Sequence, residues 1–293
     1  MRKFLTIPII CLSISCGVIL KEQSGSRVLS DQVDVNHRKE IESTLRVKDK
    51  LLHVTWFLPK YSIVKGWVLL QHGFARSRKH VRDLAERLAE NGMIVVTPTL
   101  TSDELKDGNL ALEMANTLID NPNVPEGQKL PERFVLVGHS MGGEFVSNMA
   151  AQFSKKVITG FKGLLLLDAV DVNRSMLREL EKTKGIDVMA LLAQPSWCNM
   201  LSNVTGVLKA FKQDREFVGL RLSGGTHCDA EGDSTDSLCT LVCGPSTRKN
   251  IGIVRDFASH WVESLITGLT DVEYFPGGTK FEGLLTGAGA TRL

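Results

Sequence analysis

The chain has 293 residues, of which 43% are hydrophobic and 23% are charged, as is usual for a globular protein. Its 35 basic and 33 acidic side chains nearly cancel, and no run of Lys or Arg resembles a nucleic-acid-binding surface. The length fits one α/β domain, and we expect no nucleic-acid partner.

The first residues resemble an export signal rather than part of a folded domain. Two basic residues precede an apolar segment over residues 4–14, which small residues around Cys16 follow. The apolar segment is shorter than the roughly 20 residues that span a bilayer, so we predict a signal peptide over residues 1–16. The segment also resembles a bacterial lipoprotein box, although Ser13 stands where Leu is usual. We expect an exported protein, either a periplasmic or membrane-anchored lipoprotein lipidated at Cys16, or a secreted one.

The rest of the chain predicts a linker followed by one domain. Residues 17–44 are mostly polar and predict the linker, and residues 45–293 predict the domain. Apolar runs predict strands at 51–57, 67–70, 93–96, 134–137, 163–167, 188–192 and 217–222. Apolar residues at helical spacing predict helices at 79–91, 105–119, 144–153, 173–182 and 248–266. This alternation predicts a mostly parallel sheet with helices on both faces.

The strongest signal for chemistry is the sequence Gly-His-Ser-Met-Gly at residues 138–142. It matches G-x-S-x-G and lies between a predicted buried strand and a predicted helix, which is where this motif presents a nucleophilic serine. A serine hydroxyl needs an adjacent base, and the start of a helix offers N–H groups to the oxygen that becomes negative. We therefore predict that Ser140 is a nucleophile, rather than part of a glycine-rich turn without catalysis.

Two histidines follow Ser140 and are candidates for its base, His227 and His260. In folds that present a serine on a G-x-S-x-G turn, the order along the chain is nucleophile, acid, histidine. His227 lies on a Gly-rich loop after the last predicted strand, whereas His260 lies within the final amphipathic helix. We predict that His227 is the base.

The acid that orients the base is predicted from the ends of strands. Asp168 closes a run of leucines, where an unpaired buried charge would be costly, and Asp171 is the alternative. No carboxylate follows the next strand at 188–192. Asp187 precedes that strand, and Asp214 is typical of a solvated loop.

Two backbone N–H groups are predicted to form an oxyanion hole. One belongs to Met141, directly after the nucleophile. The other belongs to Phe74, with Ala75 as the alternative, because an early strand ends there in His-Gly. His72 precedes the serine and is predicted to brace this loop.

These motifs resemble the α/β-hydrolase group that contains plant chlorophyllases and platelet-activating-factor acetylhydrolases. The resemblance covers about residues 50–266 and is carried by residues 72–74, 138–143, 168–171 and 225–229. In that group the acid follows the strand after the nucleophile's helix, which agrees with Asp168. The resemblance implies an α/β-hydrolase fold and hydrolysis of carboxylic esters through an acyl-enzyme, without a cofactor or a metal.

Four cysteines lie outside the predicted signal: Cys198, Cys228, Cys239 and Cys243. An even number in an exported chain predicts two disulfides, for which three pairings exist. We favour Cys198–Cys228 with Cys239–Cys243, because the segments that hold Cys198 and Cys228 follow neighbouring strands at one sheet edge. A zinc site is the weaker alternative, since only Cys239 and Cys243 are close in sequence.

The sequence thus predicts an esterase for a small-molecule or lipid ester. Segments 173–184 and 194–214 are expected to cover its pocket and set specificity. A lipase or peptidase with the same triad is one alternative. A non-catalytic surface lipoprotein that uses the fold for binding is another, because fold does not fix function.

Overall fold

The computed structural model describes residues 39–60, 63–120, 124–183, 185–212 and 218–293. The predicted signal peptide, Cys16 and most of the predicted linker lie outside the described residues. Within the described part of the chain, no helix is both long enough and apolar enough to cross a bilayer.

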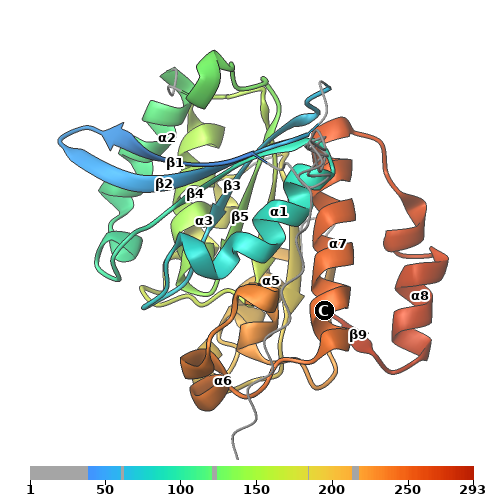
Figure 1. Cartoon of the computed structure of the whole chain (residues 1–293). Helices are drawn as coiled ribbons and strands as arrows, with labels where there is room; N and C mark the ends of the chain where they lie inside the picture. Colours follow the sequence, from blue (N-terminus) through green and yellow to red (C-terminus); the bar gives the residue numbers. More distant parts are fainter. Residues whose placement is uncertain (1–38, 61–62, 121–123, 184, 213–217) are drawn as a thin grey trace, which may run out of the picture. The chain divides into compact units, whose positions relative to one another are not determined.

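The described residues form a nine-stranded sheet in the order β1-β2-β4-β3-β5-β6-β7-β8-β9 (Figure 1). The strands are β1 (Lys39–Val47), β2 (Lys50–Leu58), β3 (Gly66–Gln71), β4 (Met93–Pro98), β5 (Phe134–His139), β6 (Phe161–Leu167), β7 (Asp187–Leu192), β8 (Val218–Leu222) and β9 (Ala290–Arg292). Neighbours from β4 through β3 to β8 are parallel, whereas β1, β2 and β9 join the sheet antiparallel. The carboxyl ends of the parallel strands therefore meet at one edge.

The helices connect these strands. They are α1 (Arg82–Glu90), α2 (Gly108–Asp120), α3 (Met141–Lys155), α4 (Met176–Glu181), α5 (Val204–Lys212), α6 (Ser237–Cys243), α7 (Arg248–Thr267) and α8 (Thr279–Thr286). Short 3₁₀ segments are η1 (Arg78–Val81), η2 (Glu104–Lys106), η3 (Pro125–Gly127), η4 (Trp197–Asn199), η5 (His227–Ser234) and η6 (Val272–Tyr274).

Two apolar layers cover the sheet, one on each face. In β5, Phe134 and Leu136 belong to the layer that contains residues of α2, α3, α4 and α5. Val135 and Val137, which alternate with them, belong to the layer that contains residues of α1, α7 and α8. Successive residues of a strand point to opposite faces, so a strand covered on both faces needs a continuous apolar run. The predicted parallel sheet with helices on both faces is confirmed.

The start of the domain differs from the prediction. Residues 39–44, predicted as linker, belong to β1, where Leu45 and Val47 are buried and Arg46 between them is exposed. The acidic and basic residues of the exposed face hide this alternation in the sequence. The Gly-rich tail forms α8 and β9, and Phe281 of α8 is fully buried.

Candidate active site

Ser140 occupies a sharp turn between β5 and α3. Its φ of 56° and ψ of −128° lie outside the regions that residues other than glycine normally adopt. The Ser140 N–H donates to the carbonyl of Leu167 at 3.0 Å, and the Ser140 carbonyl accepts from the amides of Gly143 and Val170 at 2.9 and 3.0 Å. These bonds hold the unusual backbone in place, as expected of a turn that presents a nucleophile.

The glycines of the motif are required because backbone segments approach closely here. A Cβ atom on Gly138 would lie 2.5 Å from the carbonyl oxygen of Gly142, and a Cβ on Gly142 would overlap the carbonyl of His72. A Cβ on Gly73 would lie 2.5 Å from the Cβ of Ser140. The loop after β3 therefore reaches the serine only because residue 73 has no side chain.

Asp168 and His227 form a buried pair at the same edge of the sheet. The His227 Nδ1–H donates to Asp168 Oδ2 at 2.5 Å. The amide of Ala193 donates to Oδ1 at 2.9 Å, and Asn199 Nδ2 donates to Oδ2 at 3.1 Å. Burial opposes the charge of Asp168, but these hydrogen bonds outweigh it and hold its pKa below the usual value. The carboxylate is therefore charged at neutral pH, and it bonds to Nδ1 of His227 rather than to Nε2.

Asn199 is a residue that the sequence analysis missed. Its side chain is fully buried, and its Oδ1 accepts from the amides of Ser196 and Ser202 at 2.8 and 2.9 Å. Its Nδ2 donates to the carbonyl of Gln194 at 2.8 Å as well as to Asp168. These bonds fix which end of the amide faces the carboxylate. Ser196 three residues before Asn199 signals a local cap, but nothing local signals the contact with Asp168.

Asp171, the alternative acid, bonds to the start of α4, whereas Asp168 bonds to His227. Its Oδ1 accepts from the amides of Ser175 and Met176 at 2.9 and 3.2 Å, at the start of α4. It thus satisfies amides that a helix start leaves without partners, and none of its hydrogen bonds is with His227. Asp187 begins β7, at the opposite end of that strand, and Asp214 lies outside the described residues.

The candidate base His260 lies away from this pair. It is in α7, where its Nδ1 lies 2.8 Å from Asp271 Oδ2 and its ring stacks on Tyr274. Those contacts hold the helix against the segment that follows it. Of the two candidate histidines, the structure brings His227 together with Asp168.

Two further histidines brace the site in neutral form. The amide of Leu100 donates to His72 Nε2 at 3.0 Å, so Nδ1 carries the proton and donates to the carbonyl of Gly73 at 2.8 Å. His139 Nε2 donates to the carbonyl of His227 at 3.0 Å. Burial lowers the pKa of His72 to about 4. Burial, and then the nearby His227, lowers the pKa of His139 to about 4.

The predicted oxyanion donors lie on either side of Ser140. Met141 is the first residue of α3, so its amide has no acceptor within the helix. On the loop after β3, the amide of Ala75 donates to Ser102 Oγ at 3.4 Å. That contact leaves Phe74 as the better of the two candidates on this loop.

Ser140 and His227 line one cavity of about 400 Å³. Its lining is mainly apolar, and its described residues are Phe74, Ala75, Arg76, His139, Ser140, Trp197, Cys198, His227, Glu231, Leu238, Cys239, Val242 and Cys243. The prediction for the cover of this cavity was wrong in part. Segment 173–184 contributes none of these lining residues, and 194–214 contributes Trp197 and Cys198. Helix α6, which the sequence analysis missed, contributes Leu238, Cys239, Val242 and Cys243.

Arg76 connects three segments around the cavity. Its Nε and Nη2 donate to the two carboxylate oxygens of Glu231, both at 2.6 Å. Its Nη1 and Nη2 also donate to Asp236 at 3.1 and 3.0 Å. The hydrogen bond from Arg76 holds the pKa of Asp236 well below its usual range. Glu231 lies in η5 and Asp236 caps α6, so Arg76 joins both segments to its own loop. We call Arg76, Glu231 and Asp236 the Arg76 clamp.

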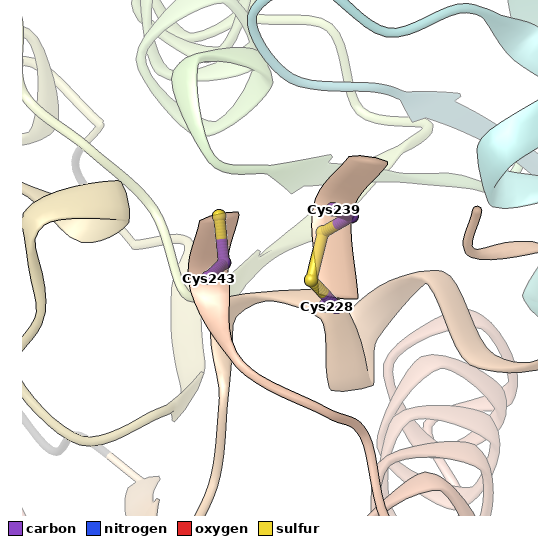
Figure 2. A group of neighbouring side chains, drawn as sticks. All are labelled: Cys228, Cys239 and Cys243. Carbon is purple, nitrogen blue, oxygen red and sulfur yellow. A yellow bond between two sulfur atoms is a disulfide. The ribbon is translucent and has the colours of Figure 1, made fainter. Parts of the chain in front are cut away.

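The disulfides differ from the predicted pairing. Cys198 is bonded to Cys243, and Cys228 is bonded to Cys239. Figure 2 shows Cys228 bonded to Cys239 with Cys243 beside them, and these three sulfur atoms lie within 4.8 Å of one another. Helix α6 lies between two loops, so each of its cysteines bonds to a different loop. Sulfur atoms held in disulfides are not thiolates, so they do not form the zinc site considered as the alternative.

Comparison with known proteins identifies the fold. No family model matches the chain, and no curated protein matches it. A solved structure of dienelactone hydrolase from Anabaena variabilis matches with a TM-score of 0.54 and 16% sequence identity, over 77% of this chain and 97% of that chain. The chain therefore has the α/β-hydrolase fold.

The disulfides give a prediction about stability. Replacing both Cys228 and Cys239 by Ser should lower the free energy of unfolding by roughly 2–3 kcal/mol, because the bond closes a short loop in the unfolded chain. Urea denaturation under oxidising conditions measures the difference, and peptide mapping without reductant checks the pairing. Peptides that join Cys198 to Cys228 would contradict the structure.

The neutral histidines predict a loss of stability in acid. The unfolded chain binds a proton at His72 below its ordinary pKa of 6.5, whereas the folded chain does so only near 4. This residue therefore stabilises the fold above pH 6.5, and that contribution is lost as the pH falls toward 4. In His72→Asn, the fall in unfolding free energy between pH 7 and pH 5 should be smaller by about 1–2 kcal/mol. Equal pH dependence of the two proteins in urea denaturation would refute this.

Proposed function

We propose that the protein is a serine hydrolase that cleaves carboxylic esters through an acyl-enzyme. The observation that carries this proposal is the Asp168–His227 pair, 2.5 Å apart, beside the cavity that Ser140 and His227 both line. A serine, a buried carboxylate and a histidine, which follow one another in this order along the chain, form the nucleophile, the orienting acid and the base of acyl transfer. The shared fold supports a hydrolase, because the protein of similar architecture is a dienelactone hydrolase.

In the proposed first step, Ser140 Oγ attacks the carbonyl carbon of the ester while its proton passes to His227 Nε2. Asp168 stabilises the imidazolium that forms, and the amides of Phe74 and Met141 donate to the negative oxygen. The carbon–oxygen bond to the alcohol then breaks, and the leaving oxygen takes the proton from Nε2. The products of this step are a free alcohol and an acyl group on Ser140.

In the second step, water replaces the alcohol. His227 Nε2 takes a proton from the water while its oxygen attacks the acyl carbon, again with the oxyanion facing Phe74 and Met141. The bond to Ser140 Oγ breaks, and the serine oxygen recovers the proton from Nε2. The carboxylic acid leaves, and water is the only other reactant.

We also propose that the protein is exported. Its two disulfides favour an oxidising compartment, because cytosolic thiols are normally kept reduced. A membrane anchor on Cys16 belongs to the same proposal, and it would bring the cavity close to lipid esters.

Ser140 gives the most direct test. Ser140→Ala should abolish turnover of p-nitrophenyl acetate and covalent labelling by a fluorophosphonate probe, because no other group would attack. Ser154→Ala, near the end of the same helix, serves as the control and should keep both. Undiminished turnover in Ser140→Ala would refute the proposed nucleophile, and a wild-type protein that neither reacts nor turns over would support a binding protein instead.

The two aspartates allow a matched comparison. Asp168→Asn should lower kcat by at least about 100-fold, because the histidine loses its orienting carboxylate and the charge that stabilises its protonated form. Asp171→Asn should change kcat by less than about threefold, since the amide oxygen of Asn can accept the same hydrogen bonds from Ser175 and Met176. Steady-state kinetics with p-nitrophenyl acetate measure both, and a larger loss in Asp171→Asn would reverse the assignment of the acid.

A further inference from the structure

Helix α6 borders the cavity and exposes most of its apolar side chains. It contains no charged residue, and Cys239 is its buried residue. Leu238, Leu241 and Val242 are 58%, 83% and 66% exposed. Packing of its own apolar face therefore does not explain why the helix stays where it is.

Covalent and ionic links hold α6 instead. Its two cysteines are bonded to Cys198 and Cys228 on neighbouring loops. Asp236 accepts from the amide of Cys239 at 2.9 Å and is also held by Arg76. A helix so strongly fixed, with large apolar side chains left in water, is unfavourable unless those side chains bind something apolar.

Several exposed apolar side chains line the cavity together. Leu238 and Val242 of α6 line the cavity together with Phe74 and Trp197, which are 56% and 88% exposed. We call these four residues the apolar rim. They come from three segments that are distant in sequence, and the rim continues the apolar lining that contains Ser140. Leu241, on the same helix, does not line this cavity.

The described residues that line the cavity offer no unpaired charge to a substrate. Among its described lining residues, the charged ones are Arg76 and Glu231, which bond to each other. The guanidinium is also bonded to Asp236, so two carboxylates surround one cation. An anionic group on a substrate would have to displace these bonds or lie beside excess negative charge. A neutral group avoids both costs.

From these contacts we propose that the substrate is a neutral ester with a large apolar group, and that the apolar rim binds this group. The assignment rests on the proposed esterase function and adds its substrate class. Leu238 and Val242 then determine which sizes of apolar group react well, because both line the cavity and remain exposed.

The test compares esters of different chain length in matched variants. For the wild type, kcat/KM for p-nitrophenyl octanoate should exceed that for the acetate by at least about tenfold, because the added methylenes leave water. In Leu238→Ser/Val242→Ser this ratio should fall to within about threefold. Leu241→Ser removes an equally apolar side chain from the same helix but not from the cavity, and it should keep the wild-type ratio.

A second comparison tests charge. The half-ester p-nitrophenyl glutarate, which carries a free carboxylate, should react at least about tenfold more slowly in kcat/KM than neutral p-nitrophenyl hexanoate. Equal rates for these two, no preference for octanoate in the wild type, or equal ratios in the double variant and Leu241→Ser would each overturn the assignment. Each of these outcomes would overturn the substrate class alone, because the wild type would still turn over esters and react with the fluorophosphonate probe. Loss of both in the wild type would instead refute the esterase function, and this assignment with it.

Discussion

A single buried carboxylate determines how the loops around the cavity are arranged. Asp168 is only 3% exposed, and a buried charge without partners would cost several kcal/mol. Its partners come from three places in the chain: the amide of Ala193 after β7, Asn199 in η4, and His227 in η5. These groups meet because the carboxyl ends of β6, β7 and β8 lie side by side in the sheet. Stabilising the charge therefore also fixes three loops relative to one another.

The loop that carries His227 is held in several directions at once. The next residue, Cys228, is bonded to α6, and Asp229 accepts from the amides of Thr226 and Thr247 at 2.7 and 3.3 Å. Glu231 is bonded to Arg76, on the loop that carries the proposed oxyanion donor. Burial raises the pKa of Asp229, against the effect of these hydrogen bonds. An imidazole on such a loop loses little freedom when a substrate binds, which favours reaction from a preformed geometry.

Features with a local cause could be predicted from the sequence. The turn around Ser140 needs small residues at fixed positions, and continuous apolar runs mark strands that are covered on both faces. Asp168 could be preferred to Asp171 because it ends a strand directly. That Asp171 instead caps a helix became visible only with the position of α4.

Features that depend on which distant segments meet could not be predicted. The buried amide of Asn199 looks like a local cap until Asp168 is placed beside it. The cysteine pairs depend on α6, a helix too short to show a periodic pattern. Once its position is known, Cys239 and Cys243 can reach separate loops, and the pairing follows from proximity rather than from spacing in sequence.

The Arg76 clamp affects both the position of α6 and the charge of the cavity lining, whereas the residues of the apolar rim affect neither. The hydrogen bonds from Arg76 to Asp236 fix the start of α6, and together with those to Glu231 they keep the guanidinium from offering a free charge to the cavity. A change at Glu231 would therefore remove one partner of the cation that holds Asp236, and it would alter the charge of the lining. Leu238 and Val242 take no part in this anchoring, which uses Asp236 and the two cysteines. Their size can therefore change without moving the helix, so under the proposed assignment the size of the apolar group can vary independently of the proposed preference for neutral esters.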